Sequence, residues 1–140
     1  MKEKTKITVE VDINATIEDT WTSFITEDSI IQWNHASDDW CCPWAKNNFK
    51  VDGEFSYRME AKDGSFGFDF AGKYLEIEEK KKIMYELGDS RRVEVQFIQD
   101  VNKTKIIETF DAEEENSLEL QKNGWQAILN NFKKYIELKR

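Results

Sequence analysis

A long amphipathic segment near the C-terminal end constrains the fold more than any other feature of the sequence. Its apolar residues recur at spacings of three, four and seven: Leu118, Trp125, Ile128, Leu129, Phe132, Tyr135 and Ile136. The positions between them are mostly Lys, Asn, Gln and Glu, which predicts a helix with one face packed and the other in water. Asn116, with Glu119 three residues later, is predicted to cap its N-terminus. Such a helix needs an apolar surface to lie against.

The residues before this helix are predicted to supply that surface. Residues 6–13 alternate between β-branched and polar side chains, which predicts a strand with one buried face. Thr16, with Asp19 three residues later, predicts the N-cap of a short amphipathic helix. A second short helix is expected over residues 28–33. Residues 34–52 show no clean period and contain the only proline, so we interpret them as a long irregular loop.

The dipeptide Asp63-Gly64 predicts a hairpin and its register. If these two residues form the turn, the numbers of paired residues sum to 127. Tyr57 then faces Phe70 and Met59 faces Phe68, so this face of the hairpin is apolar and aromatic. A sheet face of this composition matches the apolar stripe of the final helix.

Further strands are expected around residues 83–87, 93–97 and 104–111. The apolar phase shifts after Gly72, which predicts a β-bulge there. Pairing of the last two strands places Glu108 on the same face as the alternating apolar residues of the strand before it. Glu108 is therefore predicted to be a carboxylate on an apolar face.

The charge balance and the cysteines limit the partners and the compartment. Asp and Glu number 28 against 20 Lys and Arg, a net charge of −8 at pH 7. An acidic surface argues against nucleic acid and against anionic membranes. No apolar run approaches the ~20 residues of a membrane span, so no membrane insertion is expected. Cys41 and Cys42 are adjacent and make a poor structural disulfide, and no signal segment is visible, which favours the cytoplasm.

Several short motifs accompany this order of elements. They are residues 36–40, 49–55, 68–74, 109–110, 116–121 and 124–129, with Phe132 and Tyr135. Together they resemble the START-like (helix-grip) superfamily, in particular stand-alone proteins similar to the activator of heat-shock protein 90 ATPase, also described as polyketide-cyclase-like. The resemblance implies one α+β domain over residues 1–140. In this fold a curved antiparallel β-sheet wraps a long C-terminal α-helix, and two short helices follow the first strand.

The same resemblance implies a ligand cavity between sheet and helix. The residues expected to line it are Trp33, Trp40, Trp44, Tyr57, Met59, Phe68, Phe70, Tyr85, Phe97, Glu108, Trp125 and Leu129. The alternative is that these side chains simply fill a core. An apolar pocket with a few polar groups is typical of small-molecule sites.

Three residues are candidates for acid–base chemistry. Desolvation should raise the pKa of Glu108, which would let it act as an acid or base or anchor a polar ligand group. His35, the only histidine, lies beside Asp38 in the irregular loop, where the two could transfer protons. The alternatives are a satisfied core carboxylate and a solvated loop histidine. A metal site formed by His35, Asp38, Cys41 and Cys42 lacks the usual ligand spacing, so we expect no metal ion and no cofactor.

Three functions follow as hypotheses. The first is binding of a small hydrophobic molecule, lipid-like or aromatic, without catalysis. The second is a chaperone-binding module that acts on a heat-shock protein 90 homologue. The third is a cyclase or dehydratase that uses Glu108 with His35 or Asp38. The protein is expected to be a monomer or weak dimer.

Overall fold

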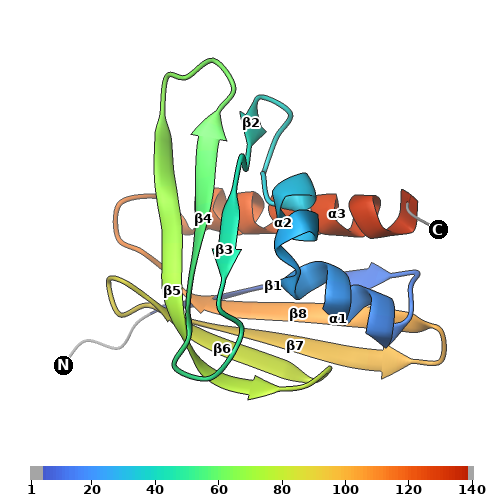
Figure 1. Cartoon of the computed structure of the whole chain (residues 1–140). Helices are drawn as coiled ribbons and strands as arrows, with labels where there is room; N and C mark the ends of the chain where they lie inside the picture. The colour runs from blue at the N-terminus through green and yellow to red at the C-terminus, as the bar shows by residue number, and fades with distance from the viewer. Residues whose placement is uncertain (1–4, 139–140) are drawn as a thin grey trace.

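A computed structural model describes residues 5–138, which form one antiparallel sheet of eight strands and three helices (Figure 1). The elements in chain order are β1 (Lys6–Ile13), α1 (Ile17–Ile25), α2 (Glu27–Trp33), β2 (Trp40–Cys41), β3 (Ala45–Asn47), β4 (Glu54–Ala61), β5 (Gly67–Glu78), β6 (Lys82–Leu87), β7 (Arg92–Asp100), β8 (Lys103–Asp111) and α3 (Leu118–Leu138). The strands are ordered β1-β8-β7-β6-β5-β4-β2, and β3 also pairs with β4. No helix in residues 5–138 is long and apolar enough to cross a membrane.

The sheet is strongly curved, and the long helix lies along its hollow side. Figure 1 shows β4 and β5 (green) standing across the direction of β7 and β8, with α3 (red) running past them and α1 and α2 on the same side of the sheet. Within the sheet α3 contacts β1, and it also contacts α1 and α2. This is the helix-grip α+β fold expected from the sequence.

The local signals that rest on turn and cap chemistry are confirmed. The backbone N–H of Asp19 donates to the Thr16 hydroxyl at 3.2 Å, so Thr16 caps α1. The hairpin register pairs Tyr57 with Phe70 and Met59 with Phe68. These predictions succeed because each depends on residues that are neighbours in sequence or across one short turn.

Two local predictions are wrong. The register shift in β5 lies between Tyr74 and Glu76, not at Gly72. A Cβ on Gly72 would lie 2.8 Å from a ring carbon of Phe55, so this glycine makes room for an aromatic ring. The expected loop over 34–52 also contains the short strands β2 and β3, because they can pair with the otherwise free edge of β4.

The two ends of α3 differ in how they meet the rest of the molecule. The hydroxyl of Ser117, not the side chain of Asn116, accepts the backbone N–H of Leu120 at 3.1 Å, so the helix begins one residue later than predicted. Leu118 is half exposed, whereas Phe132 and Ile136 are fully buried. The C-terminal half of α3 therefore belongs to the core, while its first turns lie where the sheet opens.

The solid core lies at the end of the molecule where α1, α2 and α3 meet. The ring of Phe24 packs edge-on against Phe97 and Phe132, and stacks on Trp33 at a centroid distance of 5.3 Å. Edge-to-face and stacked pairs at such distances are favourable aromatic arrangements. Phe24 and Trp33 therefore mark the border between this core and the space in front of β4 and β5.

Candidate functional site

An apolar cavity of about 270 Å³ lies between the curved sheet and α3. It is lined by Phe24, Ile25, Trp33, Asn34, Phe55, Tyr57, Met59, Phe68, Phe70, Tyr74, Ile83, Tyr85, Arg91, Glu108, Trp125 and Ile128. Strands β4, β5, β6 and β8 form the walls, and one turn of α3 forms the cover. We call this space the inner cavity.

A second hollow of about 360 Å³ adjoins the inner cavity on the side of the first turns of α3. Five residues border both spaces: Met59, Phe68, Arg91, Trp125 and Ile128. We call the second space the outer groove. Because Phe68 is 42% exposed, this side leads to solvent. The two spaces together fall within the ~300–1,000 Å³ of typical small-molecule sites.

Aromatic packing at the cover keeps the cavity open. The indole of Trp125 stacks on Phe110 at 4.0 Å between centroids and meets Phe70 edge-on at 5.9 Å. Each ring is therefore supported by another ring of the wall. Aromatic side chains are rigid, so supported in this way they hold a space that flexible chains would collapse into.

Glu108 is the one carboxyl group on the inner wall. Its neighbours across β8 are Val9 on β1 and Val95 on β7, and Ile106 and Phe110 flank it along the strand. The residue is 8% exposed, and its carboxyl makes no hydrogen bond within residues 5–138. Desolvation raises the pKa of Glu108 from 4.5 to about 8, so the group is mostly a neutral acid at pH 7. The prediction of a carboxylate on an apolar face is confirmed.

Three tyrosines surround the same space but differ in their hydrogen bonds. The hydroxyl of Tyr74 donates to Asn47 Oδ1 at 2.6 Å and lies 3.4 Å from the hydroxyl of Tyr57. Tyr85 makes no side-chain hydrogen bond in the described chain. Burial is the first cause that raises the pKa of each: that of Tyr74 to about 12, and those of Tyr57 and Tyr85 well above the ordinary value. All three are neutral donors near pH 7.

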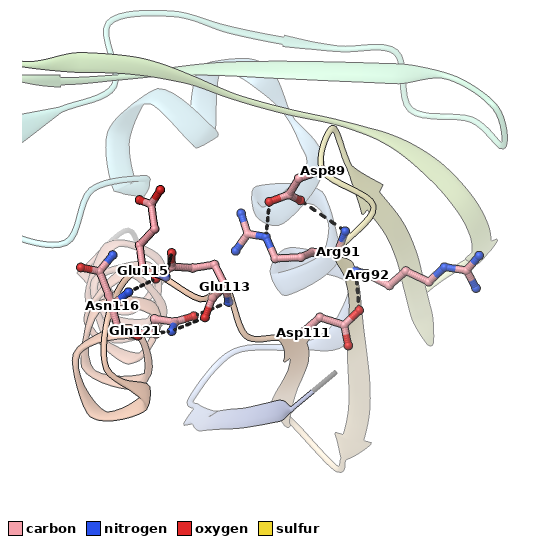
Figure 2. Close-up of polar contacts among 8 residues, drawn as sticks. All are labelled: Asp89, Arg91, Arg92, Asp111, Glu113, Glu115, Asn116 and Gln121. Carbon is pink, nitrogen blue, oxygen red and sulfur yellow. Dashed lines mark hydrogen bonds and ion pairs between the residues drawn. The ribbon is translucent and has the colours of Figure 1, made fainter. Parts of the chain in front are cut away.

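Arg91 places a positive charge where the two spaces meet. Figure 2 shows its side chain extending from the turn between β6 and β7 toward the side of the molecule where Glu113 and Gln121 lie. Its Nε donates to Asp89 Oδ2 at 2.7 Å, and its backbone N–H donates to Asp89 Oδ1 at 3.3 Å. Desolvation raises the pKa of Glu113, but hydrogen bonds from Asn116 and Glu115 outweigh it and hold the pKa below its usual range, with a smaller contribution from the charge of Arg91.

The structure brings most of the expected lining residues together. Eight of the twelve line the inner cavity: Trp33, Tyr57, Met59, Phe68, Phe70, Tyr85, Glu108 and Trp125. Trp40 lines the outer groove instead. Trp44 is 39% exposed with the Lys46 ammonium above its ring, and Phe97 and Leu129 are buried in the core. Phe97 and Leu129 follow apolar periods, which show burial but not what lies opposite, and Trp44 lies in a stretch without such a period.

His35 and Asp38 do not join Glu108. Neither is among the residues that line the inner cavity or the outer groove. His35 Nδ1 is buried without a hydrogen-bond partner, and desolvation followed by the charge of Lys62 lowers the pKa of this imidazole. The structure therefore does not bring His35 or Asp38 to the cavity that Glu108 lines, as the cyclase or dehydratase hypothesis expected.

The cysteines are free thiols, Cys41 half-buried and Cys42 buried. Burial raises the pKa of Cys42 to about 11.

The Asn34 amide donates to Met59 Sδ at 3.3 Å. Across residues 5–138, no group of three or more His, Cys, Asp or Glu side chains is arranged to hold a metal ion.

Sequence reasoning missed several lining residues. They are Phe24, Ile25, Asn34, Phe55, Tyr74, Ile83, Arg91 and Ile128. Phe55 precedes Tyr57 by two positions, so strict alternation along β4 could have found it. The bulge predicted at Gly72 put Tyr74 out of phase, whereas the register of β5 shifts only after Tyr74. Arg91 lies in a turn, where no period indicates direction.

The fold and the site define a class: START-like α+β proteins with an apolar cavity under the C-terminal helix. The chain matches the family described as "Activator of Hsp90 ATPase homolog 1-like protein" over residues 14–137, and it belongs to this family. No curated protein matches the chain.

Solved structures of similar proteins agree with this assignment. An AHSA1-like protein from Aeromonas hydrophila is 40% identical, with a TM-score of 0.90 over 96% of this chain and 94% of that one. A protein from Cytophaga hutchinsonii is 46% identical, with a TM-score of 0.82 over 96% and 93%. A protein from Chromobacterium violaceum, 16% identical with a TM-score of 0.85 over 95% and 98%, is alike in fold alone.

Proposed function

We propose that this protein binds a small hydrophobic molecule, lipid-like or aromatic, in the inner cavity between the sheet and α3. The observation that carries the proposal is an apolar cavity whose single carboxyl group, Glu108, has no partner of its own. A buried acid without a hydrogen bond destabilises the fold, because its desolvation is not offset. A ligand in the cavity would supply both apolar contacts and a polar partner.

The shape of the site supports a ligand-binding cavity rather than a water-filled packing defect. Trp125, which covers the cavity, packs on the ring of Phe110 and against the wall residue Phe70, so its position is fixed by aromatic contacts. The outer groove supplies an approach from solvent, since it shares its border residues with the inner cavity. Preformed apolar pockets with few polar groups are typical of small-molecule binding.

The test is an NMR titration of the ¹⁵N-labelled protein with decanoate and, separately, with 2-ethylnaphthalene. We expect shifts concentrated at β4, β5 and the first half of α3. The variant Ile128→Trp, which fills the boundary between the two spaces, should abolish them. Ile98→Trp adds the same side chain on the exposed outer part of β7 and should leave binding unchanged. Absence of cavity shifts with both ligands would refute the proposal.

Family membership supports a second candidate, a chaperone-binding module that acts on a heat-shock protein 90 homologue. It predicts a change in the ATPase rate of a bacterial homologue when the full chain is added. The Ile128→Trp variant separates the two functions, because filling the cavity leaves the outer surface of the sheet unaltered. An unchanged ATPase rate at saturating protein would remove this candidate.

A further inference from the structure

The inner cavity contains two hydrogen-bond donors that the protein itself leaves unused. Glu108 and Tyr85 are each more than nine-tenths buried, yet neither side chain makes a hydrogen bond within the described chain. The other two tyrosines differ, since their hydroxyls are within reach of each other and one donates to Asn47. Both side chains border the cavity, so their polar atoms can meet a molecule placed there.

The strand register brings the two donors to one place. Tyr85 of β6 pairs with Val93 of β7, and Glu108 of β8 pairs with Val95 of the same strand. The two valines are short and fully buried, so the longer side chains on either side border a common space above β7. Both of these longer side chains line the inner cavity.

The polar groups that line the cavity indicate which kind of ligand atom they can bind. Across the described chain, the titratable groups that line the cavity are Tyr57, Tyr74, Tyr85, Glu108 and Arg91. The guanidinium is a donor only, whereas a protonated carboxyl and phenol hydroxyls can both donate and accept. Next to Glu108, β1 and β7 present valines and α3 presents Trp125 and Ile128, none of them charged. Each of the five groups therefore has a hydrogen that it can donate to a ligand carrying only an acceptor atom.

We propose that the Glu108 carboxyl and the Tyr85 hydroxyl together bind one acceptor oxygen of the ligand, the carbonyl of an otherwise apolar aromatic ketone. A carbonyl oxygen has two lone pairs and accepts two hydrogen bonds. The aromatic wall contacts the ring system, and the carbonyl lies at the inner end above Val93 and Val95. This inference deepens the proposed function and rests on it, since it specifies the polar end of the hydrophobic ligand.

The experiment compares two matched probes, 2-acetylnaphthalene ¹³C-labelled at the carbonyl and 2-ethylnaphthalene, which lacks the oxygen. Tyr85→Phe and Glu108→Leu should each weaken the ketone about three- to tenfold, the range expected for one net hydrogen bond. Both variants should leave the affinity for 2-ethylnaphthalene within about twofold, because this hydrocarbon has no oxygen to accept a hydrogen bond. The bound carbonyl should also shift downfield, and each substitution should reduce that shift. Tyr135→Phe, which removes a tyrosine hydroxyl outside the cavity, is the control and should alter neither probe.

A pH profile tests the protonated carboxyl separately. Ketone affinity of the natural protein should fall above pH 8, because an ionised Glu108 repels the carbonyl oxygen, whose acceptor atom carries partial negative charge. Glu108→Gln keeps an N–H donor at the same position, so its ketone affinity should be retained at pH 7 and become independent of pH. If both probes bind and the substitutions affect them equally, the donor pair is refuted and the proposed function stands. If neither probe binds, the donor pair is refuted, and the proposed function is refuted as well only if decanoate also causes no cavity shifts.

Discussion

Replacing Glu108 by Gln should remove a pH-dependent loss of stability. The folded-state pKa of Glu108 is raised from 4.5 to about 8 by burial. Between these values the unfolded chain releases a proton that the folded protein retains, so the free energy of unfolding falls as pH rises. The slope is ~1.4 kcal/mol per pH unit, with a limit of ~5 kcal/mol over the whole window. Water entering through the outer groove reduces this, and we expect ~2–3 kcal/mol.

The assay is urea unfolding of both proteins at pH 5, 6, 7 and 8.5. The stabilities of the natural protein and of Glu108→Gln should diverge with rising pH, the variant becoming the more stable by ~2–3 kcal/mol at pH 8.5. Glu94→Gln, a half-buried position on the other face of β7, is the matched control and should follow the natural protein. Parallel curves for the natural protein and Glu108→Gln would refute the reasoning, since they would mean that the carboxyl ionises as freely in the folded as in the unfolded state.

Three further predictions concern packing, reactivity and capping. Gly72→Ala should lower the free energy of unfolding by ~1–3 kcal/mol, because its Cβ would meet the phenyl ring on the neighbouring strand. The control Gly88→Ala, in open space, should change the free energy of unfolding by less than ~0.5 kcal/mol. Equal melting temperatures of the two variants would contradict the prediction. Iodoacetamide at pH 8 should modify Cys42 far more slowly than Cys41, because the thiolate is the nucleophile and burial raises the pKa of Cys42 to about 11. Mass spectrometry of Cys41→Ser and Cys42→Ser would measure the two rates, and similar rates would contradict the prediction. Ser117→Ala should lower stability by ~1 kcal/mol through loss of the α3 cap, and unchanged urea midpoints would show that another group caps the helix.

The sequence is informative wherever a structure depends on near neighbours. Alternation identified β1, the Asp63-Gly64 turn identified the pairing of β4 with β5, and Thr16 marked the start of α1. The same logic placed Glu108 on an apolar face, because a strand period of two and one short turn suffice to relate β7 to β8. The sequence predicts these features because each depends on contacts among residues that are close together in the chain.

The division between core and cavity was decided only by tertiary structure. Trp33 and Phe97 are both buried aromatic residues, but only Trp33 borders the cavity, because the curvature of the sheet decides which buried side chains meet open space. That curvature depends on how several strands pair at once, including a bulge whose position the sequence misplaced. The same tertiary arrangement places Arg91, from a turn, at the boundary of the cavity and leaves His35 outside the lining.

The amphipathic C-terminal segment shows both contributions in one element. Its apolar period by itself determined that α3 would be a helix with one packed face, since 3.6 residues per turn relates position to direction along a single chain. Whether a residue on that face meets core or open space depends on the opposite wall. Phe132 meets the rings of α1 and α2, whereas Trp125 and Ile128 cover the cavity. The period sets the direction of a side chain, and only the assembled sheet sets what that side chain encounters.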